Sequence, residues 1–223
     1  MVLEIRPLTT DELEAAFRIR TQAFNISPQQ LQDYRASLRL DRTLGAFDAG
    51  QLIATAVVHE LAQFFGGRPV PMGGVASVAV VPHRCGSGVV TRLLGATLEV
   101  MHERGEVIST LYPATAVPYR RMGWEVAGYR VHRRVPLRSL ATLPPPAARV
   151  AVCPSGESDL ERLAATYATV ATKTNGFVHR NEWWWPSVAR VSDRRRAPLP
   201  LRRRGGCRDS GVSRISAAAG ERR

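Results

Sequence analysis

The stretch SVAVVPHRCGSGVVTRLL, from Ser77 to Leu94, places a glycine-rich turn between an apolar segment and a helix-like pattern. The first turn of a helix carries unpaired backbone N–H groups and the positive end of the helix dipole. Glycine lets that backbone approach a phosphate without an intervening side chain. Gly86-Ser87-Gly88 is therefore either a simple tight turn or a cradle for phosphate groups.

The turn matches neither of two familiar phosphate-binding patterns. It lacks the lysine of a P-loop, and Val89, Val90 and Thr91 follow it where the GxGxxG pattern requires its third glycine. Cys85, directly before the turn, could be a reactive thiol because a helix N-terminus stabilises a thiolate.

Tyr119 is a second residue whose type could do chemistry. A phenol stays protonated at neutral pH and can donate its proton to a leaving group within hydrogen-bond reach. The alternative is that Tyr119 only packs beside Met122 and Trp124, which follow it closely in the chain.

Hydrophobic periodicity predicts the elements that position these residues. Thr9 and Glu12 form a candidate capping box at the start of the first helix. Further helices are expected at 29–39, 89–104 and 116–122, strands at 2–6, 43–47, 51–61, 70–81 and 107–112, and a final strand or pair of strands at 124–135. The order β-α-α-β-β-β-α-β-α-β predicts an α/β (α+β) domain over residues 1–142, a mixed central sheet flanked by helices.

A second region follows a change in composition. Residues 143–149 form a proline-rich linker, and residues 150–189 begin a second, shorter unit with a strand at 149–152 and a helix at 159–170. Residues 190–223 lack apolar periodicity and are rich in arginine, so disorder is predicted there.

Charge and composition limit the classes of function that the chain could have. The tail 190–223 holds eleven arginines against three acidic residues, so the other 189 residues carry only +4 of the net charge of +12. A nucleic-acid-binding protein using this tail is an alternative, although no DNA- or RNA-binding module is visible. The histidines and the three cysteines lack metal-ligand spacing, so no metal is expected.

The chain has no apolar run of about 18 residues and no apolar signal-peptide core, so no membrane partner is expected. Free thiols are typical of the cytoplasm, which is the expected location.

In order along the chain, three segments resemble the GNAT acyltransferases. IRPLTTDELEAAFRIRTQAF is similar to the family's opening, VAVVPHRCGSGVVTRLL to its motif A, and YRRMGWEVAGY to its later Y-x-x-x-G-F segment. Two further stretches, LYPATAVPYRRMGWEVAG and YATVATKTNGFVHRNEWWW, resemble the actinobacterial Eis (enhanced intracellular survival) branch. The resemblance implies a GNAT fold for residues 1–142 and the truncated start of a second GNAT-like domain at 150–189. It also implies acetyl-CoA as co-substrate and a primary amine as acceptor: an aminoglycoside, a polyamine or a lysine-like group.

The resemblance also implies roles for residues at matching positions. The amine would attack acetyl-CoA directly, and Tyr119 would be the general acid that protonates the departing CoA thiolate. The cofactor-binding residues would be Val78, Ala79 and Val80 along the pantetheine arm, Arg84, Gly86, Ser87, Gly88, Val89, Val90 and Thr91 at the pyrophosphate, and Ala114 and Thr115 on the next strand.

Two departures from the family pattern stand out. Cys85 occupies the position of a usual arginine, and Arg84 sits one place early, which removes or displaces a phosphate contact. Eis-like enzymes take their base from a terminal carboxylate on a sterol-carrier-like domain, whose sequence is not seen here. We therefore expect a truncated chain with an out-of-frame tail, in which the family's hexamer is not favoured. A non-catalytic acyl-CoA-binding remnant is the alternative to an active enzyme.

Overall fold

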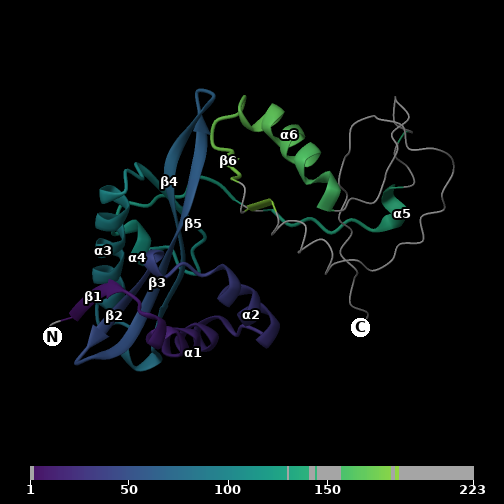
Figure 1. Ribbon diagram of the computed structural model, residues 1–223. Helices are drawn as coiled ribbons and strands as arrows, with labels where there is room; N and C mark the ends of the chain where they lie inside the picture. The colour runs from purple at the N-terminus through teal and green to yellow at the C-terminus, as the bar shows by residue number, and fades with distance from the viewer. Residues whose placement is uncertain (1–2, 130, 141–143, 145–156, 182–183, 186–223) are drawn as a thin grey trace. The chain divides into compact units, whose positions relative to one another are not determined.

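The computed structural model describes residues 3–129, 131–140, 144, 157–181 and 184–185 (Figure 1). Its strands are β1 (Leu3–Pro7), β2 (Thr43–Asp48), β3 (Gln51–Phe65), β4 (Arg68–Val80), β5 (Ile108–Leu111) and β6 (Val178–His179). Its α-helices are α1 (Leu13–Phe24), α2 (Pro28–Ser37), α3 (Val89–Glu103), α4 (Val117–Arg120), α5 (Leu137–Leu140) and α6 (Leu160–Ala171). Short 3₁₀ turns are η1 (Thr10–Glu12), η2 (Leu40–Arg42), η3 (Pro82–Arg84) and η4 (Glu157–Asp159).

The chain divides into two compact units. The first comprises Met1–Ala127 together with Asn175–His179, and the second comprises Gly128–Thr174 and Arg180–Arg223. In the second unit, the described residues include α6, which carries Tyr167. The Cζ atom of Arg180 lies 4.0 Å from the centroid of the Tyr167 ring. The residues that carry the candidate chemistry all belong to the first unit.

The sheet of the first unit has the order β1-β2-β3-β4-β5. The first four strands are antiparallel neighbours, and β5 pairs with β4 in parallel. A parallel neighbour needs a crossover, and α3 supplies it between β4 and β5. This mixed sheet with helices confirms the predicted fold class.

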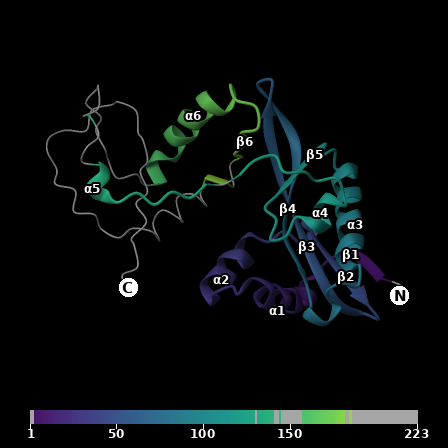
Figure 2. The same cartoon turned by 180° about the vertical axis from the view of Figure 1, so that it is seen from behind.

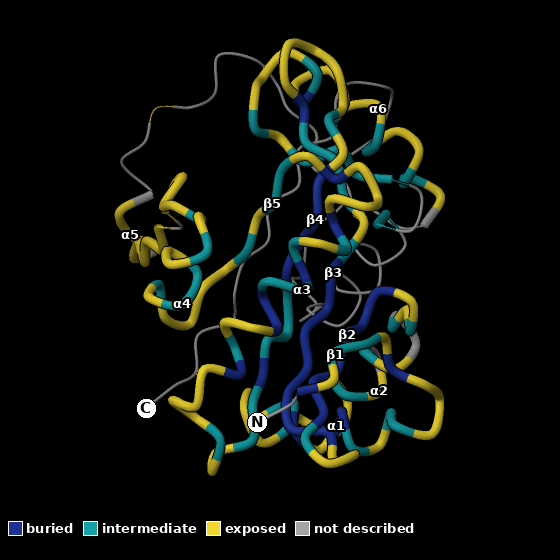
Figure 3. The backbone as a smooth tube through the Cα atoms, turned by 90° about the vertical axis from the view of Figure 1, so that its left-hand side faces the viewer, coloured by how far each residue is buried: buried dark blue, intermediate teal, exposed yellow. Residues whose placement is uncertain are grey.

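Helices cover both faces of this sheet, with α3 on one side and α1 and α2 on the other (Figures 1 and 2). Leu93 and Leu94, in the apolar stripe of α3, are fully buried. The stripe packs against small residues such as Ala54 and Ala56 on β3. In Figure 3 the buried backbone runs through β2 and the central parts of β3 and β4.

The start of α1 is held by the predicted capping residue Glu12. Its carboxylate accepts the Thr9 backbone N–H at 2.8 Å and an Arg6 guanidinium N–H at 2.6 Å. The hydrogen bond from Arg6 lowers the pKa of Glu12 to about 2. These contacts anchor the helix that covers the second face of the sheet.

The tip of the β3–β4 hairpin pairs with a segment that comes much later in the chain. β6 pairs antiparallel with Ala62 and Gln63, beyond the end of the β2 ladder. The Gly176 N–H donates to the Phe64 carbonyl at 2.8 Å, and the Phe64 N–H donates to the Phe177 carbonyl at 2.8 Å. This pairing covers backbone groups of an otherwise open strand edge. Residues 175–179 thus group with the first unit, although their sequence belongs to the predicted 150–189 region.

The prediction of strand structure at 124–135 is wrong for the residues that the structure describes there. Residues 124–129 and 131–135 form no strand. Alternating apolar residues there, including Val126, Val131 and Val135, are exposed. Extended sequence becomes a strand only where a neighbour supplies hydrogen bonds. The pattern predicts a half-buried strand but cannot reveal whether β5 offers such an edge.

Other predicted elements agree with the structure to within a few residues, except that β3 extends to Phe65. The predicted strand at 149–152, nearly all of the 143–149 linker and the 190–223 tail lie outside the described residues.

Candidate functional site

The carboxyl-terminal part of β4 is irregular on both of its edges. On the β3 side, pairing shifts from Ala79 opposite Thr55 to Ala76 opposite Val57, so β4 holds one extra residue there. Ser77 takes up this bulge with a positive φ of 56°. On the other side, the described β5 ladder ends at Val75, so Ala76–Val80 keep backbone groups without a strand partner on that edge.

The three predicted pantetheine residues lie on this open segment and alternate between the faces of the sheet. Val78 and Val80 pack towards the α3 face, and Ala79 is buried against the α1 face. Unpaired backbone N–H and C=O groups on a strand edge can bind an extended amide-bearing ligand as an added strand would. The geometry therefore fits the expected interaction with a pantetheine arm.

The glycine-rich turn leads from β4 into α3. Gly86 and Gly88 both have φ of +80°, a conformation that glycine adopts at little cost. A Cβ atom added to either residue would meet nothing within 4 Å, so the space above the turn is open. The Ser87 hydroxyl donates to the Arg84 carbonyl at 2.6 Å and thereby holds the turn closed.

The residues after the turn form the first turn of α3. Val89 is buried and anchors the helix in the core, Val90 is half-buried, and Thr91 is exposed. A fifteen-residue helix leaves the N–H groups of this first turn without partners inside the helix. Open space beside these N–H groups is what a pyrophosphate requires.

Arg84 and Cys85 do not supply an unpaired cation for binding a phosphate group. The Arg84 guanidinium is ion-paired with the carboxylate of Asp48, at the end of β2. Cys85 is exposed, and its thiol lies 3.9 Å from the Val81 carbonyl oxygen. The contact between Asp48 and Arg84 joins segments that are far apart in the sequence, so no local sequence pattern indicates it.

Tyr119 lies on α4 and is half-buried. Its ring meets the Trp124 ring edge-to-face at a centroid distance of 6.1 Å. Burial raises the pKa of Tyr119 above its ordinary value near 10, which keeps the phenol protonated at neutral pH. The residue therefore packs beside Trp124, as one reading expected, and also retains a proton to donate.

One apolar cluster brings the predicted site residues together. Its buried centre comprises Val58, Val75, Leu94 and Met101. Val78 from β4, Val90 from α3 and Tyr119 from α4 all pack against this centre. Ala114 and Thr115 are exposed in the connection from β5 to α4 and are not part of the cluster. Three separate stretches of sequence thus converge on one apolar cluster.

Among the described residues, no three His, Cys, Asp or Glu side chains gather in a way that could hold a metal ion. None of the helices that the structure describes is both long and apolar enough to cross a membrane.

Comparisons with known proteins agree with this geometry. Residues 4–127 match the family model described as an acetyltransferase (GNAT) domain. The chain belongs to the GNAT family. An uncharacterized N-acetyltransferase of Streptomyces griseus is 28% identical over 204 residues, covering 83% of this chain and 47% of that protein. An uncharacterized N-acetyltransferase of Streptomyces avermitilis is 32% identical over 131 residues, covering 56% and 31% respectively.

Solved structures give the same result for this GNAT chain. A GCN5-related N-acetyltransferase from Kribbella flavida has a TM-score of 0.71 and 28% identity, covering 85% of this chain and 49% of that one. Eis1 from Mycobacterium abscessus has a TM-score of 0.59 and 27% identity, covering 89% and 49% respectively. The chain thus spans about half the length of these relatives.

Proposed function

We propose that this GNAT protein is an acetyl-CoA-dependent N-acetyltransferase that transfers an acetyl group to a primary amine. The packing of Val78 on open β4, Val90 just after the glycine-rich turn and Tyr119 against one apolar cluster carries the proposal. Acetyl-CoA would lie with its pantetheine along Val78–Val80 and its pyrophosphate at the start of α3. The likeness to proteins named N-acetyltransferases supports an amine nitrogen as acceptor. The acceptors to test first are those that the resemblance to the Eis branch implies: an aminoglycoside, a polyamine or a lysine side chain.

In the proposed mechanism, the amine nitrogen attacks the acetyl carbon directly. The new C–N bond forms, the C–S bond breaks, and the nitrogen loses a proton to solvent. Tyr119 donates its phenolic proton to the departing thiolate and later regains one from water. Its raised pKa ensures that the proton is present when the thiolate leaves.

The test measures thiol release from acetyl-CoA with an amine panel for wild type and Tyr119→Phe. Loss of a general acid should lower kcat about 100-fold while the Kd for acetyl-CoA stays unchanged. Tyr129→Phe is the matched control because that ring is 89% exposed and has no proposed role. Equal kcat in wild type and Tyr119→Phe would remove Tyr119 from the mechanism.

A non-catalytic acyl-CoA-binding protein is the second candidate, because the open edge of β4 and the glycine-rich turn suit cofactor binding whether or not turnover follows. The Arg84–Asp48 ion pair engages the cation expected to contact the pyrophosphate, so it bears on cofactor affinity in both candidates. Acetyl-CoA binding by calorimetry, without turnover on any amine of the panel, would establish this second function instead.

A further inference from the structure

The face of the sheet opposite α3 carries a guanidinium, that of Arg20, which is hydrogen-bonded to Tyr34 but has two nitrogens without a partner. Arg20 lies on α1, and its Cζ atom sits 3.2 Å from the centroid of the Tyr34 ring on α2. Its Nε and Nη1 atoms are shielded from solvent and have no hydrogen-bond partner. Buried polar groups normally find partners, so this arrangement points to a partner that arrives with a ligand.

The Arg20–Tyr34 pair lies next to the bulge of β4. A hydrogen bond links the side chains of Tyr34 and Ser77, the residue with positive φ at the bulge. Ser77 is adjacent to Val78, where the proposed cofactor site begins. An acceptor that reaches the acetyl group from the α1 face would therefore pass this pair.

The other charged groups on this face do not neutralise Arg20. Glu14 is committed to Arg35, with a distance of 2.6 Å between carboxylate and guanidinium. Within the part of the chain that the structure describes, no ion pair includes Arg20. His59 is close enough that the Arg20 charge adds to burial in lowering the pKa of the imidazole. The local field is therefore positive.

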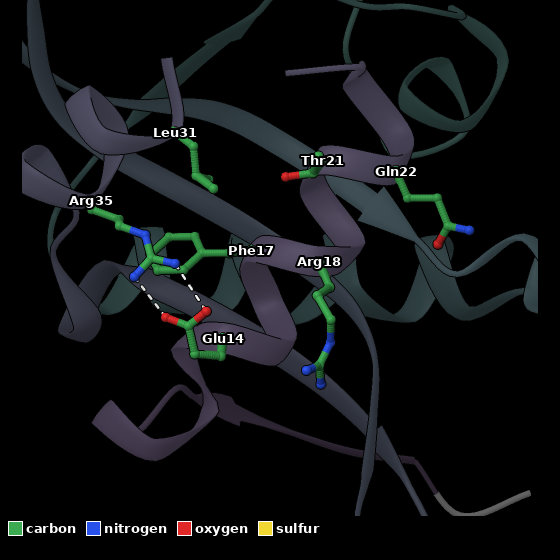
Figure 4. Close-up of a pocket in the computed structure, with 7 residues that line it drawn as sticks. All are labelled: Glu14, Phe17, Arg18, Thr21, Gln22, Leu31 and Arg35. Atoms are coloured by element: carbon green, nitrogen blue, oxygen red, sulfur yellow. Dashed lines mark hydrogen bonds and ion pairs between the residues drawn. The ribbon is translucent and has the colours of Figure 1, made fainter. Parts of the chain in front are cut away.

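The groove between α1 and α2 contains an arginine that, unlike Arg20, is paired with a carboxylate (Figure 4). It has a volume of about 420 Å³ and is lined by Phe17, Leu31 and the Glu14–Arg35 ion pair. The Arg35 guanidinium lies 4.2 Å from the centroid of the Phe17 ring and already has its carboxylate partner. Arg20 has an aromatic support of the same kind, Tyr34, but no carboxylate.

We propose that Arg20, supported by Tyr34, binds an anionic oxygen group of the acceptor. The acceptor would then be a primary amine that also carries a carboxylate or phosphate, in contrast to a polycation such as a polyamine. A planar guanidinium with two unpartnered nitrogens suits such an oxygen group. This inference rests on the proposed N-acetyltransferase function and narrows the primary amine to one that also carries an anionic group.

The test compares amines that differ in their anionic group. The pairs are γ-aminobutyrate with n-butylamine for the carboxylate and O-phosphoethanolamine with ethanolamine for the phosphate. We expect wild type to favour the anionic member of at least one pair about tenfold in kcat/KM. The pair that shows the preference identifies the group.

Arg20→Gln should abolish this preference through KM for the anionic amine, with KM for acetyl-CoA and the rate on the neutral amine unchanged. Arg20→Lys should restore part of it. Arg18→Gln is the matched control because Arg18 is exposed on the same helix. If Arg20→Gln does not fold, Tyr34→Phe keeps the ring, removes the hydrogen bond to Ser77 and should reduce the preference by a smaller factor.

Equal rates on both members of each pair in wild type would overturn the inference and leave the acetyltransferase function standing. A thermal-shift titration with the same amines tests for the anion site when no amine is acetylated. If no amine is acetylated but the anionic amine still raises Tm in wild type and not in Arg20→Gln, the anion site is supported and the proposed function fails.

Discussion

The two faces of the sheet in the first unit offer binding groups of different kinds. On the α3 face, the groups are backbone N–H groups at a turn whose glycines leave open space, and Arg84 is already ion-paired. On the α1 face, the groups are the side chains of Arg20 and Tyr34, which come from two helices. The comparison indicates that the proposed cofactor site depends on backbone shape, whereas the proposed acceptor site depends on side-chain identity.

Gly86→Val tests the dependence on backbone shape and should have the largest effect. The new side chain would occupy the open space needed by the pyrophosphate and would strain a φ of +80°. We expect the Kd for acetyl-CoA to rise about 100-fold, equivalent to about 2.7 kcal/mol, in an isothermal titration.

Gly105→Val is the control for strain in that experiment. Gly105 follows the other end of α3, has φ of +72°, and a Cβ there would also meet nothing within 4 Å. The control should lose similar stability and keep its affinity for acetyl-CoA. Equal losses of affinity in both variants would show that the turn acts through stability alone.

Arg84 and Asp48 test whether a side chain also contributes on the α3 face. If Arg84 leaves Asp48 to contact the pyrophosphate, Arg84→Gln should weaken acetyl-CoA binding about tenfold. Asp48→Asn should tighten it about threefold, because the competing carboxylate is gone. Titrations at two salt concentrations measure both effects. Weaker binding by Asp48→Asn would instead make Asp48 a positioning residue for Arg84.

Acidification should destabilise the α1 face before the α3 face, with a smaller effect than the substitutions above. Arg6 lowers the pKa of Glu12 to about 2, and Arg35 lowers the pKa of Glu14, both below the ordinary value of 4.5. Stability from such carboxylates is present above pH 4.5 and is lost as the pH falls through the lowered values. The two residues hold α1, whereas α3 packs through apolar contacts.

Hydrogen exchange, normalised to intrinsic rates, should therefore show α1 losing protection before α3 between pH 4.5 and 2. In Glu12→Gln, the pH dependence at the start of α1 should shrink. Loss of protection in α3 first would contradict the assignment of the ion pairs to the α1 face.

The α3 face was largely predictable because its determinants are local. A strand, a glycine pair and an amphipathic helix follow one another within eighteen residues, from Ser77 to Leu94. Glycine content and helical periodicity translate directly into a turn with exposed N–H groups. The mixed α/β fold follows from the same local signals along the chain.

The sequence by itself thus determined the order of most elements, the glycine-rich turn and the residue types available for chemistry. Only the tertiary structure decided which of them meet: Arg84 with Asp48, Arg20 with Tyr34, and Tyr34 with the bulge at Ser77. It also decided that the described residues of 124–135 form no strand. Pairing across the sheet depends on partners far away in the chain, and no local pattern of residue types carries that information.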